Sequence, residues 1–176
     1  MTRIFAATEK MVRLIDDLLN LSRITRTEMK RERLDLSALA RKIADTKMKA
    51  QPQREVEFVI EDDLFVEGDD RLLSVVLENL LENAWKFTGK CKSARIELGT
   101  MMLEGRLAYF IRDNGTGFDM EYAGKLFQPF QRVHAMDELL GTGIGLATVK
   151  HIIERHGGRV WIEGEVWNGT TVYFTL

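Results

Sequence analysis

One segment of the chain places two amides and a lysine on a single face of a helix. Asn79, Asn83 and Lys86 fall within about one-sixth of a turn of each other at roughly 100° per residue. The adjoining apolar stripe consists of Leu73, Val76, Leu77, Leu80 and Ala84. Amide oxygens can complete the shell of a magnesium ion that keeps several waters, and an ammonium group can pair with phosphate oxygens. An isolated pattern of this kind is usually a solvated helix edge, so a magnesium-nucleotide ligand depends on the rest of the chain.

Two glycine-rich segments follow this helix. Residues 113–117 (D-N-G-T-G) come directly after the strand-like run 107–111, which predicts a turn at the end of a strand. Residues 141–146 (G-T-G-I-G-L) lead into a segment with helical apolar spacing, which predicts a loop that opens a helix. Backbone amides at a helix start are free to bind phosphate, and glycines let the phosphate come close.

Two familiar phosphate-binding motifs do not fit the second segment. A dinucleotide-binding fingerprint needs G-x-G-x-x-G in the first βαβ unit, whereas this G-x-G-x-G lies near the carboxyl end of the chain. A Walker loop needs Gly-Lys-Ser/Thr, which is absent from this segment.

The ordered set of motifs resembles the nucleotide-binding domain of sensor histidine kinases of two-component systems, most closely the phytochrome-type and PAS-linked bacterial kinases. The matching boxes are N-L-L-E-N-A-W-K-F-T (79–88), D-N-G-T-G (113–117), F-Q-P-F (127–130) and G-T-G-I-G-L (141–146). The resemblance implies an α+β fold of the Bergerat type, a sandwich of a mixed sheet with helices on one face. Gyrase, the heat-shock chaperone ATPases and MutL-type ATPases share that fold.

The resemblance also implies roles for the matching residues, with ATP and magnesium as cofactors. Asn83 corresponds to the magnesium ligand, Asn79 to its companion in the helix, and Lys86 to a phosphate-contacting lysine. Asp113 corresponds to the carboxylate that accepts a hydrogen bond from the adenine amine. Further ATP-binding positions are Gly115, Gly117, Gly141, Thr142, Gly143, Ile144, Gly145, Leu146 and Thr170.

Residues 118–140 contain no long periodic element, and such a stretch in a compact domain is usually a functional loop or disordered. We expect an ATP lid there. Lys125 and Arg132 are expected to reach the phosphates from it, and Arg132 joins Asn79, Asn83 and Lys86 as a catalytic candidate. Phe127 and Phe130 are expected to anchor the lid to the core.

The amino-terminal segment, residues 1–33, predicts a helix that needs a partner. Its apolar positions follow the a/d spacing of a coiled coil and are Ile4, Ala7, Met11, Leu14, Leu18 and Leu21. The segment resembles the second helix of the kinases' dimerisation and phosphotransfer bundle, which implies a homodimer in the full-length protein. The alternative is a helix folded back on its own domain. The basic cluster at 30–33 is expected to be a solvated helix end.

Residues 34–176 are expected to form the catalytic ATP-binding domain. Ser37 is a candidate N-cap for a helix over 38–50, and Asp69 or Asp70 for the helix that follows. Strands are expected at 56–60, 64–67, 93–99, 107–113, 159–166 and 170–176, with hairpins across Glu104-Gly105 and Asn168-Gly169.

Composition excludes several other classes. The chain has 176 residues, a net charge of −2 and a single cysteine, Cys91, so neither a nucleic-acid-binding surface nor an intrachain disulfide is expected. No segment approaches the apolar length of a transmembrane helix. We expect a cytoplasmic fragment without membrane contact.

The kinases resembled here phosphorylate a histidine on the first bundle helix, and none of His134, His151 and His156 has the neighbours of that acceptor. We therefore expect a fragment of a larger sensor kinase, whose partners are an acceptor-histidine helix bundle and a response regulator receiver domain. Hydrolases of the superfamily carry a glutamate four residues before the magnesium asparagine, where this chain has Asn79. Phosphotransfer is thus expected rather than hydrolysis. A Bergerat-type ATP hydrolase and a non-catalytic nucleotide-binding scaffold are the alternatives.

Overall fold

The computed structural model describes residues 28–131 and 142–176 and five helical positions before them, namely Thr8, Met11, Val12, Ile15 and Leu19. The four apolar side chains among those five positions are 50% to 62% exposed. Met11 is one of the predicted stripe positions, and the other five, Ile4, Ala7, Leu14, Leu18 and Leu21, lie outside the described residues.

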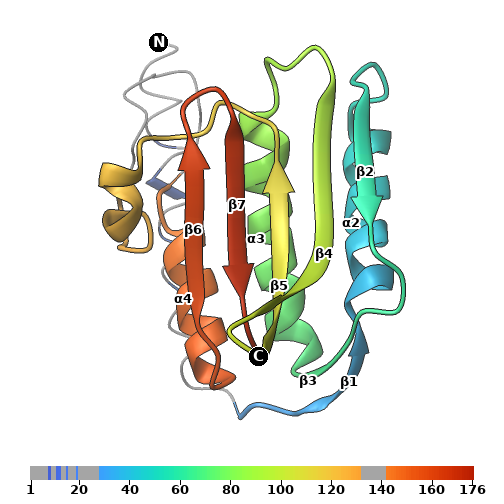
Figure 1. Ribbon diagram of the computed structural model, residues 1–176, viewed down its shortest axis with the longest axis vertical. Coiled ribbons are helices and arrows are strands. Elements are labelled where there is room, and N and C mark those ends of the chain that lie inside the picture. The colour runs from blue at the N-terminus through green and yellow to red at the C-terminus, as the bar shows by residue number, and fades with distance from the viewer. Residues whose placement is uncertain (1–7, 9–10, 13–14, 16–18, 20–27, 132–141) are drawn as a thin grey trace.

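A five-stranded mixed sheet forms one layer of the molecule (Figure 1). Its strand order is β2-β4-β5-β7-β6, with β2 parallel to β4 and every other pair antiparallel. The strands are β2 (Val56–Ile60), β4 (Ala94–Leu103), β5 (Arg106–Asp113), β6 (Val160–Glu165) and β7 (Gly169–Phe174). The expected mixed sheet is thereby confirmed.

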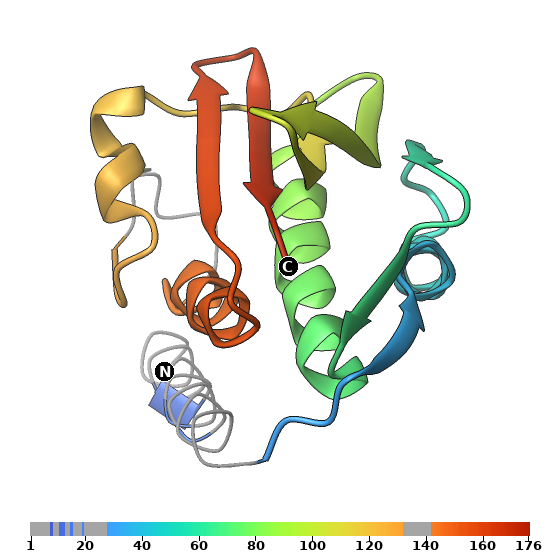
Figure 2. The same cartoon turned by 60° about the horizontal axis from the view of Figure 1, so that its bottom comes forward.

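Three helices cover one face of this sheet (Figure 2), as the Bergerat-type sandwich requires. They are α2 (Leu36–Ala50), α3 (Asp70–Phe87) and α4 (Gly145–Arg155). The apolar stripe predicted on α3 lies in the core, since all five of its members are at most 2% exposed. Burial of this stripe fixes the rotation of α3 and leaves its amide face available beside the core.

Aspartates, not serine, cap the starts of α2 and α3. Asp69 caps α3 as predicted, because its carboxylate accepts from the Leu72 N–H at 3.2 Å. The prediction of Ser37 as N-cap is wrong, since Asp35 caps α2 by accepting from the Ala38 N–H at 2.9 Å. The Ser37 hydroxyl instead donates to the Glu61 carbonyl and accepts from the Leu64 N–H. Ser37 therefore provides hydrogen-bond partners for backbone groups of the loop between β2 and β3.

A second, two-stranded sheet joins β1 (Glu32–Asp35) to β3 (Phe65–Gly68). The expectation of a helix end at 30–33 is wrong, because Arg33 and its neighbours extend into β1 and pair antiparallel with β3. This small sheet attaches the segment that follows the amino-terminal helix to the amino-terminal end of α3.

Both predicted hairpins are present. Glu104 and Gly105 connect β4 to β5 with φ of 50° and 75°, the left-handed pair of a type I′ turn. The turn between β6 and β7 differs from the prediction. Glu165 pairs with Gly169, so the loop is residues 166–168 and is centred on Trp167, whose φ is 66°.

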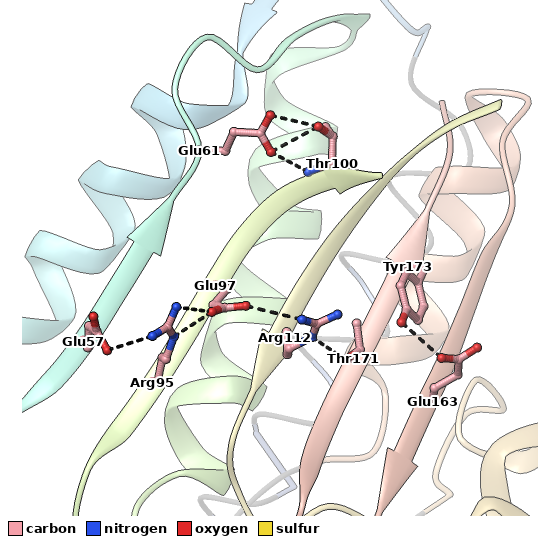
Figure 3. A network of polar contacts seen from close by, with 9 residues as sticks. All are labelled: Glu57, Glu61, Arg95, Glu97, Thr100, Arg112, Glu163, Thr171 and Tyr173. Carbon is pink, nitrogen blue, oxygen red and sulfur yellow. Dashed lines mark hydrogen bonds and ion pairs between the residues drawn. The ribbon is translucent and has the colours of Figure 1, made fainter. Parts of the chain in front are cut away.

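The face of the sheet away from the helices carries a network of paired charges (Figure 3). Arg95 contacts Glu57 at 3.5 Å and Glu97 at 2.5 Å, and Arg112 contacts Glu97 at 3.6 Å. These contacts link β2, β4 and β5 and pair the charged side chains on the solvent-exposed face of the sheet. In the described part of the chain, no helix is both long enough and apolar enough to span a membrane.

Candidate functional site

The amide face of α3 lies at the edge of the core. Asn79, Asn83 and Lys86 are each half-buried, next to fully buried stripe residues. Lys86 places its Nζ 5.0 Å from the centre of the Phe87 ring. The helix thus presents two amides and one ammonium along one line.

Asn79 contacts the second glycine segment directly. Its Nδ2 donates to the Val75 carbonyl at 2.8 Å, which turns Oδ1 outward from the helix. A Cβ added at Gly145 would lie 2.5 Å from that Oδ1. Glycine is therefore required where α4 begins beside α3, and the two motifs meet across this contact.

The amino-terminal end of α4 has no side-chain cap. Ile144 occupies the N-cap position without a side-chain hydrogen bond, whereas aspartates cap α2 and α3. The Ile144 side chain is 1% exposed and Leu146 packs against the core, so both anchor the loop. Gly143 has a φ of 75°, and its carbonyl accepts from the Phe130 N–H at 3.0 Å. The first-turn N–H groups of a helix have no partner within that helix, so those of α4 are of the kind that can bind an anionic ligand.

Asp113 ends β5 as a buried carboxylate. It is 7% exposed and pairs with Thr170 of β7 in the sheet register. Burial raises the pKa of the Asp113 carboxyl to about 6, although hydrogen bonds from the Gly115 and Thr170 N–H groups lower it. The Asp113 carboxyl is thus held by two backbone donors, and its pKa of about 6 is close to neutral pH.

The first glycine segment interlocks with the β6–β7 hairpin and with α3. A Cβ at Gly117, where φ is 59°, would lie 1.7 Å from the Glu165 carbonyl oxygen. A Cβ at Gly115 would lie 2.6 Å from the Phe87 carbonyl oxygen, and the Thr116 N–H donates to that oxygen. The loop after Asp113 therefore packs directly on the carboxyl end of the helix that carries Asn83 and Lys86.

The described part of the expected lid begins with the short helix η1 (Met120–Lys125), which packs beside β6. Lys125 is exposed and Phe127 packs against the core. The expectation that Phe130 anchors the lid is wrong, because its side chain is 56% exposed and its backbone has a left-handed φ of 66°. Arg132 and Gly141 lie outside the described residues.

The two glutamates nearest the amide face lie away from it. Glu82 pairs with Lys47 of α2, on the other flank of α3, and Glu78 is exposed. Asn79 occupies the position where the resemblance places the base of hydrolases. The absence of a water-activating carboxylate from the amide face stays a prediction.

Sequence reasoning missed the residues that hold the first glycine loop. Asn114 accepts from the Arg95 N–H and donates to the Ser93 carbonyl, which ties the loop to the start of β4. A Cβ at Gly169 would lie 2.0 Å from the Asp113 carbonyl oxygen. The Asn-Gly pairs at 114–115 and 168–169 were the available signals, but a turn prediction does not say which strands the turn contacts.

Comparison with known proteins identifies the family. The family described as "Histidine kinase-, DNA gyrase B-, and HSP90-like ATPase" matches residues 68–176. Cyanobacterial phytochrome A of Nostoc sp. is 41% identical over 109 residues, which cover 62% of this chain and 14% of the phytochrome. Sensor protein kinase WalK of Staphylococcus aureus is 31% identical over 174 residues, which cover 96% of this chain and 42% of WalK. The chain therefore spans less than half the length of these curated relatives.

Solved structures agree with this assignment. The catalytic domain of histidine kinase ThkA matches with a TM-score of 0.67 and 27% identity over 83% of this chain and 96% of that chain. Full-length ShkA in complex with AMPPNP has a TM-score of 0.76 at 23% identity, covers 98% of this chain and 37% of that chain, and shows the fold alone. The chain belongs to the histidine kinase-, DNA gyrase B- and HSP90-like ATPase family and contains the catalytic domain of a sensor histidine kinase.

Proposed function

We propose that this chain binds magnesium-ATP between α3, the first glycine loop and the start of α4. One observation carries the proposal: Asn79 of α3 meets Gly145 at the uncapped start of α4. The amide face of α3 and the first-turn backbone N–H groups of α4 therefore lie side by side, which suits a phosphate chain.

The adenine base is proposed to lie against Asp113. Its carboxylate would accept from the exocyclic amine, while Gly115 and Gly117 allow a close approach of the loop and Thr170 lies across from Asp113 in the sheet. Guanine carries a carbonyl oxygen at the corresponding ring position and would meet a carboxylate acceptor without a donor. The site should therefore prefer ATP to GTP.

The phosphates are proposed to contact the amides of residues 142–146 together with Lys86, Lys125 and Arg132. The described residues contain no cluster of three or more His, Cys, Asp or Glu side chains of the kind that holds a metal alone. A single amide oxygen from Asn83 instead suits magnesium, which keeps waters and takes its remaining ligands from phosphate oxygens. When bound, the ion would neutralise phosphate charge.

The reaction proposed for the full-length protein is transfer of the γ-phosphoryl group to a histidine on the dimerisation helix bundle, for signalling to a response regulator. In this chain the binding residues would position the phosphate chain for an incoming imidazole rather than activate water. The salt bridge of Glu82 to Lys47 supports a kinase over a hydrolase. His156 is 3% exposed and does not suit the role of acceptor.

Two partners follow from the proposal. The exposed stripe Met11, Val12, Ile15 and Leu19 suits a helix of the acceptor bundle and a homodimer. A solved complex of histidine kinase ThkA with response regulator protein TrrA matches the fold of this chain with a TM-score of 0.73 at 22% identity, over 99% of this chain and 50% of that chain. We propose a receiver domain as the second partner. Because ATP is the proposed substrate, the reaction would take place in the cytoplasm.

Base selectivity tests the nucleotide site. Calorimetric titration of the chain should show ATP binding at least about tenfold tighter than GTP binding, because one unpaired polar contact in a buried site costs about 1–3 kcal/mol. Adding magnesium should tighten ATP binding. Equal affinities for the two nucleotides would remove Asp113 from the adenine site, and no binding of either would contradict the proposed nucleotide site itself.

A further inference from the structure

Lys30 and Arg31, which follow the amino-terminal segment, contact the ends of both nucleotide-site helices. The Lys30 N–H donates to Asp69 Oδ2 at 2.9 Å, and Asp69 is the N-cap of α3. The Arg31 guanidinium donates to the His156 carbonyl at 2.7 Å, and His156 is the C-cap of α4. A cation is stabilised at a helix carboxyl end by the unpaired carbonyls there.

Asp69 and His156 also bind each other. The Asp69 N–H donates to His156 Nε2 at 3.1 Å, and His156 Nδ1 lies 2.8 Å from the Ile152 carbonyl oxygen. This pair of contacts assigns the ring proton to Nδ1, so that Nε2 accepts. The ring is also pressed against β3, because a Cβ added at Gly68 would lie 3.2 Å from Nε2.

Asp69 is charged in this arrangement although it is only 2% exposed. Burial alone would raise the pKa of its carboxyl. Hydrogen bonds from the Lys30 N–H, the Arg71 guanidinium and the Leu72 N–H outweigh burial and hold the pKa below its ordinary value. The contacts of Lys30 and Arg71 thus compensate the buried charge of Asp69, and their loss would leave that charge without these partners.

The proposed phosphate side of the nucleotide site lies farther along the same two helices, at the middle of α3 and at the start of α4. Asn79 lies ten residues along α3 from Asp69, about 15 Å at the rise of an α-helix. Gly145 begins α4, and the distance along α4 from Gly145 to His156 is similar. Between the two ends of α4, its residues Val149, Ile152 and Ile153 are fully buried. A closely packed helix moves as a unit, so a shift at His156 displaces Gly145.

We infer that Lys30 and Arg31 form a latch that couples the segment directly before β1 to nucleotide affinity through Asp69, His156 and α4. Closure of the latch holds α4 in the orientation that presents its first-turn amides beside Asn79. Release of the latch lets α4 shift, and nucleotide binding then has to restore the orientation. The inference rests on the proposed nucleotide site.

Arg31→Ala tests the latch, because Arg31 is exposed and its loss leaves the core intact. ATP affinity should fall about fivefold, the lower end of the usual range for coupled sites. Arg31→Lys, which keeps one charged donor, should recover part of the loss. Arg33→Ala is the matched control, since Arg33 stacks over Phe65 at 4.4 Å on β1 and should leave the affinity unchanged.

Coupling is reciprocal, so nucleotide should also tighten the latch. Hydrogen exchange of the Lys30 and Asp69 amides should slow when ATP is added to the wild type, and Arg31→Ala should reduce this slowing. Equal ATP affinities of Arg31→Ala and Arg33→Ala, or exchange at both amides that ATP does not change, would overturn the latch. Absence of ATP binding by the wild type would overturn the nucleotide site itself, so the two failures can be told apart.

Discussion

Asn83→Ala should lose at least about 100-fold in affinity for magnesium-ATP, while its affinity for ADP without metal should change little. The reason is that Asn83 is proposed to ligate the ion between the phosphates, and even residues that only support a metal ligand cost 10- to 100-fold when they are removed. Alanine is a better helix former than asparagine, so α3 should remain folded. Calorimetry with both ligands measures the difference.

Glu78→Ala is the control for this prediction, because Glu78 is exposed on the same helix but away from the amide face. It should bind magnesium-ATP like the wild type. Equal losses of magnesium-ATP and metal-free ADP by Asn83→Ala would remove Asn83 from the metal shell and leave it a general contact of the site.

Asp113→Asn should weaken ATP binding and at the same time stabilise the nucleotide-free domain. Loss of a charge-assisted hydrogen bond to the adenine amine should cost about 1.5–3 kcal/mol of ATP affinity. Burial raises the pKa of Asp113 from 3.8 to about 6, so the folded chain holds a proton that the unfolded chain releases. The stability from this group is complete below about pH 3.8 and is lost as the pH rises through about 6.

The stability effect has a sharp signature in pH. At pH 7.5 the nucleotide-free Asp113→Asn variant should exceed the wild type by about 2–3 kcal/mol in the free energy of unfolding, since each pKa unit corresponds to about 1.4 kcal/mol. Near pH 4 the difference should vanish. Asp119→Asn, a neighbouring exposed aspartate that caps η1, should show no such pH-dependent gain. Equal stability of Asp113→Asn and the wild type at both pH values would contradict the burial argument.

Wild-type ATP affinity should fall below about pH 6, because a protonated Asp113 accepts from the adenine amine less well. Asp113 is thus expected to favour ATP binding and to lower the stability of the empty domain. Such a residue is retained for binding at some cost to stability. The buried carboxylate lowers the stability of the empty site and is stabilised when a donor arrives.

Local patterns in the sequence predicted the parts of this fold that depend on nearby residues. The rotation of α3 follows from the spacing of its apolar stripe, and the β4–β5 hairpin follows from Glu104-Gly105 between alternating runs. The order of the motifs along the chain also predicted the family correctly. The site motifs were found because each is a compact run of residues with unusual backbone or ligand chemistry.

Contacts between distant segments were not predictable in this way. Strand β1 is the short polar run E-R-L-D, and it becomes a strand only because β3, about 30 residues later, pairs with it. Ser37 resembles a helix cap, but its hydroxyl is needed by a loop 24 to 27 residues away. Phe130 looked like a core anchor, yet its left-handed backbone and its hydrogen bond to Gly143 leave the ring exposed. In each case tertiary context decided between local alternatives.

Phosphotransfer to a separate acceptor tests the central claim most directly. The chain should be incubated with ATP labelled at the γ-phosphate, alone and with a second polypeptide that carries the complete cognate helix bundle and its acceptor histidine. We expect no acid-labile phosphohistidine on the chain alone and labelled bundle when both are present. Stoichiometric labelling of His134, His151 or His156 in the isolated chain, or failure to label a correctly folded cognate bundle, would contradict it.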